Sequence, residues 1–335
     1  MRKPDALTLL VFARSWGIII LFAVLFVAFS IWGAPIFGTF KNFSLILGAA
    51  SISTVFAAAI AMGVFSGALD LSVPGVAAVS SVAMALMLKG GINVWLAILV
   101  ALVIGAFFGL LNAVVTLRGV NPLAVTIGTL SVTSGLAAVF SGGPPVFGFT
   151  GLDFIGTAQY FGLPAPLMVV IIVYLIGTVF LTQTRGGTRF LAAGGNAEAL
   201  RRSGVNANLY KILGFVFSGV LASVGGLVTT AYTTQASPQP ATAALFTGLT
   251  AVALSGISLA GGRGSLPKVL VGSLVIAEIS SALVIKNIQP YWSTVITGLL
   301  LIIALTGELA IQKAVSKQVV QHRAATTPAA KKEDA

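Results

Sequence analysis

The sequence lacks most of the side chains on which enzyme and metal chemistry depend. It contains no cysteine and a single histidine, His322, in a polar stretch near the C-terminus. Disulfides, thiolate nucleophiles and metal sites built from cysteine or histidine are therefore excluded, and no Ser–His–Asp set can be assembled. No Gly-Lys dipeptide occurs, so the chain has no phosphate-binding loop for ATP. We expect no metal, no cofactor and no catalytic residue, and any ATP hydrolysis must come from another subunit.

Charged residues are also scarce, at 8% of the 335 residues, whereas hydrophobic residues make up 57%. A soluble globular protein has roughly 25% charged residues because its surface faces water. Long apolar runs follow one another along the chain, and a run of about 18 or more such residues is typical of a transmembrane helix. The strands of a membrane barrel would instead alternate apolar and polar residues. The composition predicts an all-α membrane protein, a polytopic helical bundle.

We predict about ten transmembrane helices within a transmembrane domain that covers residues 1–312. The predicted spans are 15–36, 44–66, 72–88, 94–117, 121–141, 166–182, 212–232, 244–260, 269–285 and 291–311. The first span is too long for the apolar core of a signal peptide, so we expect it to be retained. Residues 313–335 are rich in Lys, Thr, Pro and Ala and are expected to form a disordered cytoplasmic tail.

The basic residues are distributed unevenly among the predicted loops. With the N-terminus inside, only Lys41, Lys89 and Lys286 of the 19 lysines and arginines fall outside. Cytoplasmic loops of membrane proteins carry such an excess of basic residues, and one span more or fewer would remove the bias. Orientation in lipid therefore explains the net charge of +11, and we predict no nucleic-acid partner. Both termini are expected in the cytoplasm, with the chain in a bacterial inner membrane.

Two predicted loops are long. Residues 142–165 lie outside and are rich in Gly, Pro and aromatic residues, which favours turns over a continuing helix. Residues 183–211 lie inside and carry Arg185, Arg189 and two further arginines. The inner loop is therefore the candidate for contact with a cytoplasmic partner.

A short amphipathic helix is predicted inside the inner loop. Asn196 is a good N-cap, and Glu198 can form a pair with Arg202 four residues later. Gly204 follows Ser203 and is a natural stop. A helix of roughly two turns is too short to be stable alone in water, so it needs a partner surface. Two interpretations remain open: the helix docks on a cytoplasmic motor subunit, or the segment is a solvated basic loop that fixes orientation.

A second candidate site lies between the second and third predicted spans. In the LDLSVPG stretch, Asp70 can cap the following helix, while Pro74 and Gly75 break the regular backbone. A broken helix in a membrane can also expose polar groups to a substrate. Asp70 and Ser72 are therefore either cap residues or part of a substrate pathway.

Polar residues within the spans are the other candidates for the substrate pathway. A carboxylate in lipid is costly, so Glu278 should face the bundle interior or water, where it lines the pathway or ties two helices together. Asn112 and Ser281 are neutral polar residues within predicted spans. A pathway of hydroxyls and amides suits an uncharged polar solute better than an ion. Packing between helices is the alternative explanation for most of these side chains.

Three stretches resemble the membrane permease subunits of bacterial ATP-binding-cassette sugar importers of the ribose/xylose/arabinose type. They are SGALDLSVPG (66–75), GGNAEALRRSGV (194–205) and SGISLAGGRGS (255–265), and the first and third also resemble each other weakly. The resemblance extends over about residues 55–308. The sequence departs from the family at Pro74, at residues 245–248, where relatives have an acidic pair, and at Ser280 and Ser281, where relatives have asparagines.

The resemblance implies a set of partners and roles. The permease would form a homodimer or a heterodimer, with ATPase subunits in the cytoplasm, a periplasmic substrate-binding protein outside, and membrane lipid around it. The residues implied to couple it to the ATPase are Asn196, Glu198, Arg201, Arg202, Ser203 and Gly204. A stand-alone secondary transporter or channel remains the alternative, as does a permease of the same class for nucleosides or another small polar solute.

The orientation can be tested with reporter fusions. A phosphatase reporter fused near residue 200 should be inactive, and a reporter active only in the cytoplasm should be active there, because basic loops stay inside. The same pair fused near residue 150 should give the opposite result. Phosphatase activity from a fusion near residue 200 would overturn the predicted topology.

Overall fold

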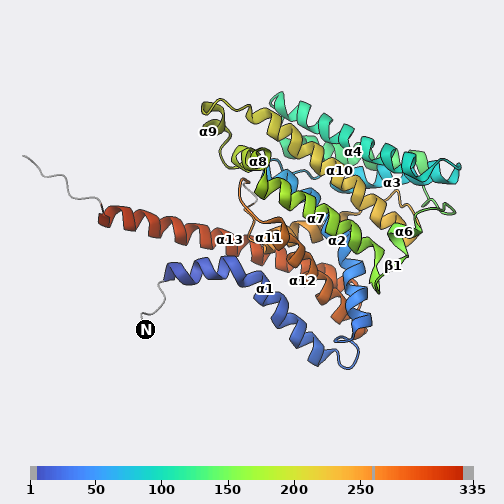
Figure 1. Ribbon diagram of the computed structural model, residues 1–335, viewed down its shortest axis with the longest axis horizontal. Helices are drawn as coiled ribbons and strands as arrows, with labels where there is room; N and C mark the ends of the chain where they lie inside the picture. Colours follow the sequence, from blue (N-terminus) through green and yellow to red (C-terminus); the bar gives the residue numbers. More distant parts are fainter. Residues whose placement is uncertain (1–5, 259–260, 327–335) are drawn as a thin grey trace, which may run out of the picture.

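The computed structural model describes residues 6–258 and 261–326, and nearly all regular structure in them is α-helical. The long helices run roughly side by side along one axis (Figure 1). The elements are α1 (Ala6–Trp32), α2 (Phe40–Phe65), α3 (Val73–Lys89), α4 (Val94–Leu117), α5 (Pro122–Ser141), α6 (Asp153–Gly156), β1 (Gln159–Tyr160), β2 (Leu163–Pro164), α7 (Ala165–Gln183), α8 (Arg185–Gly195), α9 (Ala197–Arg202), α10 (Ala207–Thr233), α11 (Thr242–Leu254), α12 (Leu266–Ile285) and α13 (Tyr291–Thr326). The two strands form a small antiparallel hairpin between α6 and α7.

Each of the ten predicted spans overlaps a helix, although α11 ends six residues before the end of the predicted span 244–260, and this agreement confirms an all-α, multi-pass membrane protein. Within the described residues, seven helices are long and apolar enough to cross a membrane: α2, α4, α5, α7, α10, α12 and the first part of α13. Three shorter apolar stretches, Trp16–Trp32, Val73–Lys89 and Thr242–Leu254, fall on the other predicted spans. The exact count of ten membrane spans therefore stays a prediction.

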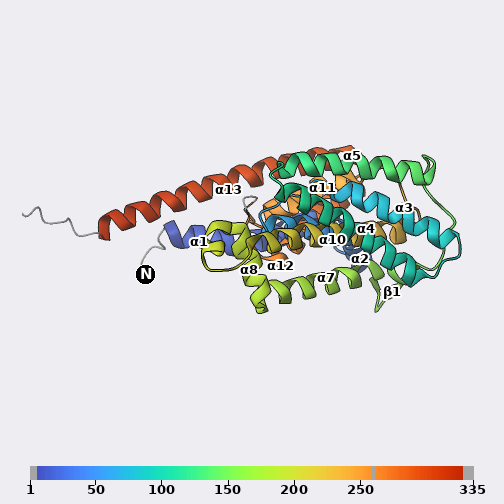
Figure 2. The same cartoon turned by 90° about the horizontal axis from the view of Figure 1, so that it is seen from above.

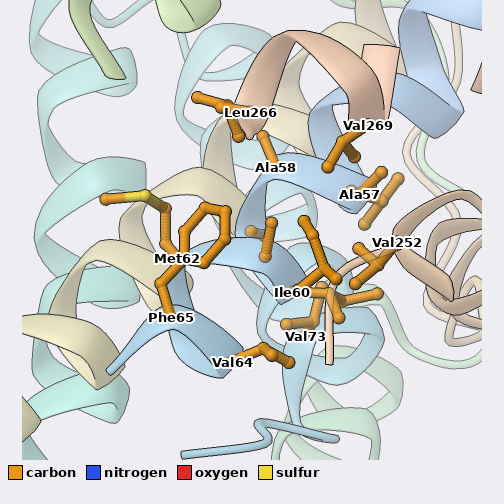
Figure 3. Close-up of a cluster of buried hydrophobic side chains, with 14 of the residues drawn as sticks. Ala57, Ala58, Ile60, Met62, Val64, Phe65, Val73, Val252, Leu266 and Val269 are labelled. Carbon is orange, nitrogen blue, oxygen red and sulfur yellow. The ribbon is translucent and has the colours of Figure 1, made fainter. Parts of the chain in front are cut away.

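Helix α2 forms the centre of the bundle. It contacts α10 on one side and α11 and α12 on another, and its second half is buried from Thr54 to Phe65. Small residues such as Ala57 and Ala58 let neighbouring helices approach closely, while Ile60 and Phe65 fill the space between them (Figure 3). The apolar side chains in the second half of α2 therefore pack against protein rather than against lipid.

Glycines bring α4 and α10 into direct backbone contact. A Cβ on Gly219 of α10 would collide with the carbonyl oxygen of Gly105 on α4, and a Cβ on Gly109 would collide with the carbonyl of Phe215. Lipid tails are as apolar as leucine, so association of membrane helices depends on such close packing. This contact fixes the position of α10, which carries much of the candidate site.

The two ends of the bundle differ. Helices α8 and α9 lie at one end, here called the α8–α9 end, and α6 with the β1–β2 hairpin lies at the other, here called the hairpin end (Figure 1). Helix α1 begins, and α13 finishes, toward the α8–α9 end in both views (Figures 1 and 2). The described parts of the two terminal helices thus share one end of the molecule with α8 and α9.

Two segments expected to be irregular are helical. Helix α13 continues to Thr326, so residues 313–326 of the expected tail are not disordered; this stretch has no glycine or proline and is rich in helix-forming Ala, Gln and Lys. Residues 327–335 lie outside the described residues.

In the inner loop, residues 183–211, helix α8 precedes the predicted short helix. Its Phe190 packs on Phe180 and Phe217, with ring centroids 5.7 and 6.0 Å away, which outweighs the poor helix propensity of its glycines.

The α4–α10 contact predicts that Gly219 tolerates no side chain. Gly219→Val should destabilise the protein by about 2–3 kcal/mol, because the backbones of both helices must move apart. A lowered melting temperature in detergent would show this. Gly128→Val on α5 is the matched control, because nothing lies within 4 Å of a Cβ at that position. Equal melting temperatures for the two variants would contradict the prediction.

Candidate functional site

The predicted short helix is present as α9. The Asn196 side chain accepts a hydrogen bond of 2.9 Å from the Ala199 N–H, as expected of an N-cap. Gly204 ends the segment with φ +80°, a left-handed conformation that favours glycine. Ser203 donates its hydroxyl to the Leu200 carbonyl at 2.7 Å. The local helix and both of its ends are therefore confirmed.

Helix α9 has an anchored side and a charged side. Leu200 is buried in the main hydrophobic cluster, whereas the side chains of Arg201 and Arg202 are 51% and 79% exposed. Both arginines pair with Glu198, at 3.2 and 3.3 Å. Exposed pairs of this kind contribute little stability, typically about 0.2–1 kcal/mol. The buried leucine therefore holds α9 in place, and the arginines remain available to a partner.

The α8–α9 junction touches the two interhelical linkers that resemble each other. A Cβ on Gly194 would collide with the Phe65 carbonyl at the end of α2, and Gly67 of linker 66–72 approaches Gly194. On the other side, a Cβ on Gly262 of linker 255–265 would collide with the backbone of Gly195. Backbone meets backbone at both contacts, so a movement of α9 cannot be absorbed by side chains.

The weak sequence echo corresponds to matching backbone geometry. Helices α2 and α11 both end at a serine, Ser66 and Ser255, each donating its hydroxyl to the carbonyl three residues earlier. Glycine follows in both cases in a left-handed conformation, with φ +78° at Gly67 and +73° at Gly256. The next helix then starts with proline in its first turn. At the described ends of both linkers, the same helix–break–helix pattern thus occurs twice.

Three of the predicted pathway residues form one buried hydrogen-bonded network. The N–H and hydroxyl of Ser72 both donate to Oδ1 of Asp70, at 2.9 and 2.6 Å. The side-chain amide of Asn112 donates to the Ser72 hydroxyl at 2.9 Å, and Thr129 donates to the Asn112 oxygen at 2.6 Å. The network, Asp70–Ser72–Asn112–Thr129, ties linker 66–72 to α4 and α5.

Details of the expected cap are corrected by this geometry. Ser72 is the N-cap residue of α3 and makes no side-chain cap bond, while Asp70 orients Ser72 rather than capping the helix itself. Pro74 and Gly75 belong to the first turn of α3 instead of breaking the backbone. Proline fits there because the first turn has no partner for its missing N–H, and a Cβ on Gly75 would collide with Thr133.

Asp70 keeps one oxygen outside the network. No hydrogen bond of standard geometry reaches its Oδ2 or the hydroxyl of the buried Ser218 within the described residues, although Ser218 lies close enough to Asp70 to favour its ionised form. Burial raises the pKa of this linker carboxyl above its ordinary value, and the hydrogen bonds from Ser72 act in the opposite direction. An acid held in this way fixes the linker, and it is closed off from any solute in this conformation.

The other two predicted pathway residues lie elsewhere, on α12. Glu278 is fully buried, as expected of an acid in an apolar span, but neither of its oxygens has a hydrogen-bond partner within the described residues. The structure therefore gives no support to a bond from Glu278 that ties two helices. Ser281 makes such a tie instead, because its hydroxyl donates to Asn42 of α2 at 3.0 Å. No hydrogen bond in the described part links either residue to the Asp70 network.

A polar cavity that sequence reasoning missed lies between α3, α10 and the segment that follows α10. It has a volume of about 120 Å³. Its polar lining residues are Ser81, Thr229, Thr230, Thr233, Gln235, Ser237 and Gln239. The signal in the sequence was the polar run TTQASPQP at 233–240, which stands between two apolar helices.

Comparison with known proteins identifies the class to which this arrangement belongs. The family described as "Branched-chain amino acid transport system / permease component" matches residues 42–305. The chain is 33% identical over 309 residues to the L-arabinose transport system permease protein AraH of Escherichia coli (strain K12), covering 90% of this chain and 94% of that protein. It is 29% identical over 278 residues to the ribose import permease protein RbsC of the same strain, covering 81% and 87%. It is 28% identical over 316 residues to the D-allose transport system permease protein AlsC, also of that strain, covering 93% and 96%.

No solved structure matches the chain. The family match covers most of the helical bundle, from the start of α2 to the first half of α13, and includes both linkers, α9 and the polar cavity. The chain therefore belongs to the permease-component family of branched-chain amino acid transport systems, and it is a membrane permease rather than an enzyme.

Proposed function

We propose that this permease carries a sugar or a similar polyol across the bacterial inner membrane as the membrane subunit of an ATP-binding-cassette importer. Three relatives that the chain matches over most of their length are named for L-arabinose, ribose and D-allose transport. The lining of the polar cavity supports an uncharged solute, because it contains hydroxyls and amides and no charged side chain.

The importer needs partners that this chain does not supply. The sequence has no phosphate-binding loop, so cytoplasmic ATPase subunits provide the energy. A periplasmic substrate-binding protein delivers the solute to the outer loop, residues 142–165. A second permease, identical or related, completes the membrane part. Alternating access follows, with ATP binding and hydrolysis shifting the population between outward-facing and inward-facing states.

Helix α9 is the proposed contact with the ATPase, and the observation that carries this is its backbone junction with both linkers. Its exposed arginines offer charge to a partner, while Leu200 fixes the helix to the bundle. Gly194 and Gly195 pass any displacement of α9 directly to linkers 66–72 and 255–265. Linker 66–72 joins α2 to α3, and linker 255–265 joins α11 to α12. A displacement of α9 therefore reaches four helices of the bundle.

The Asp70–Ser72–Asn112–Thr129 network extends this route. It holds linker 66–72 against α4 and α5, so linker, α4 and α5 move together. Asp70, Ser72 and Asn112 then act in transmission rather than in direct solute contact. Glu278 and Ser281 remain pathway candidates on α12, where neither carboxyl oxygen of Glu278 has a hydrogen-bond partner within the described residues.

The proposed topology has ten spans with both termini in the cytoplasm. The seven long helices and three shorter apolar stretches together match that count. The described ends of α1 and α13 lie toward the α8–α9 end, which supports an even number of spans (Figure 1). The transmembrane domain is then 1–312, with the coupling segment 183–211 inside and loop 142–165 outside.

Coupling can be tested with the reconstituted importer, which should take up sugar only with ATP and the ATPase subunits. The double variant R201E/R202E should lower sugar uptake per ATP about tenfold or more, because contact worth about 1.4 kcal/mol or more between subunits is lost. Membrane insertion should remain intact. Uptake and phosphate release are measured in the same vesicles.

Two controls separate charge from helix stability. Arg118→Glu makes one of the same charge changes at an exposed position outside the segment and should be tolerated. Glu198→Gln breaks both ion pairs but leaves the N-cap at Asn196, so its melting temperature reports how much these exposed pairs stabilise α9, expected to be only about 0.2–1 kcal/mol. Normal coupling in R201E/R202E, or full uptake by the chain without ATPase subunits, would refute the proposed role; the second result would instead support a secondary transporter.

The buried network predicts the effect of removing its central residue. Asn112→Leu should cost about 1–3 kcal/mol of stability, because Ser72 and Thr129 then lose their partner within a buried environment. Thr129→Val should cost less alone and add little in the Asn112→Leu background. Thermal melts in detergent measure both effects. Ser131→Ala, which removes an exposed hydroxyl of α5, is the control. Strict additivity of the two network variants would argue against a connected network.

A further inference from the structure

The polar cavity has a position suited to a solute that arrives from outside. Its lining includes Ala77 and Ala78 in the second turn of α3 and Ser81 at its middle, and it continues along the last turns of α10 to Gln239 beyond that helix. The end of α10 lies at the hairpin end, where Gly156 of α6 packs against Ala231. Most of the polar lining of the cavity therefore lies toward the hairpin end, away from α8 and α9.

The wall of the cavity is joined to the outer loop. Val146 and Ala236 exchange two backbone hydrogen bonds, of 2.9 and 3.1 Å. Ala236 stands between Gln235 and Ser237, which both line the cavity. The segment that holds the polar side chains is thus fixed to loop 142–165, the surface proposed to receive the binding protein.

The lining offers hydrogen bonds that are not already used. The side-chain amides of Gln235 and Gln239 make no hydrogen bond within the described residues, and each provides donors and an acceptor. Thr229 and Thr233 donate their hydroxyls to carbonyls of their own helix, which leaves their oxygens able to accept. Phe56 forms an apolar wall beside Gly225.

This combination favours one class of ligand. A sugar presents several hydroxyls, each both donor and acceptor, and carries no net charge. An amino acid would need partners for an ammonium group and a carboxylate, and an inorganic ion would need opposite charge. None of the described residues that line the cavity is acidic or basic. A neutral polyhydroxylated solute is therefore the ligand that the cavity fits.

We propose that this cavity is the outer solute-binding site of the permease, and that Gln235 and Gln239 are its specificity-determining residues for a neutral sugar. This inference rests on the proposed function for its choice of sugar. It adds a site and named recognition residues to it. The amides bind sugar hydroxyls, the threonine oxygens accept from others, and the bridge to Val146 links occupancy of the site to the outer loop.

The absence of native cysteine allows a direct test. Gln239→Cys gives the chain a single thiol, which a membrane-impermeant maleimide should label from outside in the assembled transporter. D-ribose, L-arabinose, D-allose and L-leucine are the probes. We expect at least one of the three sugars to slow labelling about tenfold at saturation and L-leucine to leave it unchanged. Gln289→Cys, an exposed glutamine in the α12–α13 connection, is the matched control and should be labelled at the same rate with or without sugar.

Transport assays complete the test. The substitutions Gln239→Leu and Gln235→Leu should each raise the sugar concentration at half-maximal binding to the transporter about tenfold. This is the effect expected when one hydrogen bond to a desolvated sugar hydroxyl is lost. Gln239→Asn, which keeps the amide, should recover part of the loss. Equal melting temperatures for the variants and the unmodified protein establish that the fold is intact.

The outcomes separate the two proposals. If the unmodified transporter takes up a sugar, yet no sugar protects Gln239→Cys and Gln239→Leu binds sugar normally, the cavity is not the site and the importer function stands. Protection by L-leucine alone would overturn the ligand class. If the unmodified transporter takes up none of the sugars, the proposed function itself fails.

Discussion

The structure depends on one constraint: hydrocarbon offers no hydrogen-bond partner, so every break in a helix must be satisfied by protein. Linkers 66–72 and 255–265 are such breaks, and both meet the constraint in the same way. A serine donates its hydroxyl to the carbonyl three residues earlier, and a left-handed glycine then turns the chain. Proline lies in the first turn of the next helix, where a backbone N–H would have no partner within the helix. In the first linker, Asp70 and Ser72 add a network that reaches two further helices.

Close backbone contact is the second theme, and it follows from the same environment. Lipid gives helices no hydrophobic reason to associate, so membrane helices associate through close van der Waals packing. Small residues allow the backbones to approach closely enough for that packing. Gly105 and Gly219 hold α4 against α10, and Gly194, Gly195 and Gly262 hold the α8–α9 junction against both linkers. Contacts without intervening side chains are stiff. A force on α9 would therefore move helices as bodies, which is what alternating access requires.

The polar features divide between the two ends of the molecule. Exposed arginines on α9 stand at one end, where a motor subunit would act, and an uncharged cavity lined by hydroxyls and amides stands toward the other. The buried acids belong to neither surface. Asp70 is held within its network, and Glu278 is enclosed on α12 with both oxygens unpaired. A permease that moves a neutral solute with external energy has no need of a charged pathway.

The sequence by itself determined the class, the helices and the short helix α9, because these depend on local patterns. Apolar length, basic loops, and the N-cap and stop at Asn196 and Gly204 act within a few residues of themselves. Only the tertiary structure decided that α8 is helical, since burial of Phe190 among other aromatic rings outweighs its glycines. It alone brought Asn112 to Ser72 across 40 residues, and placed Gln235 and Gln239 beside α3. Such contacts depend on which helices pack together. The four-residue repeat of small residues at Ala101, Gly105 and Gly109 marks a packing face on α4, but it does not identify the partner helix.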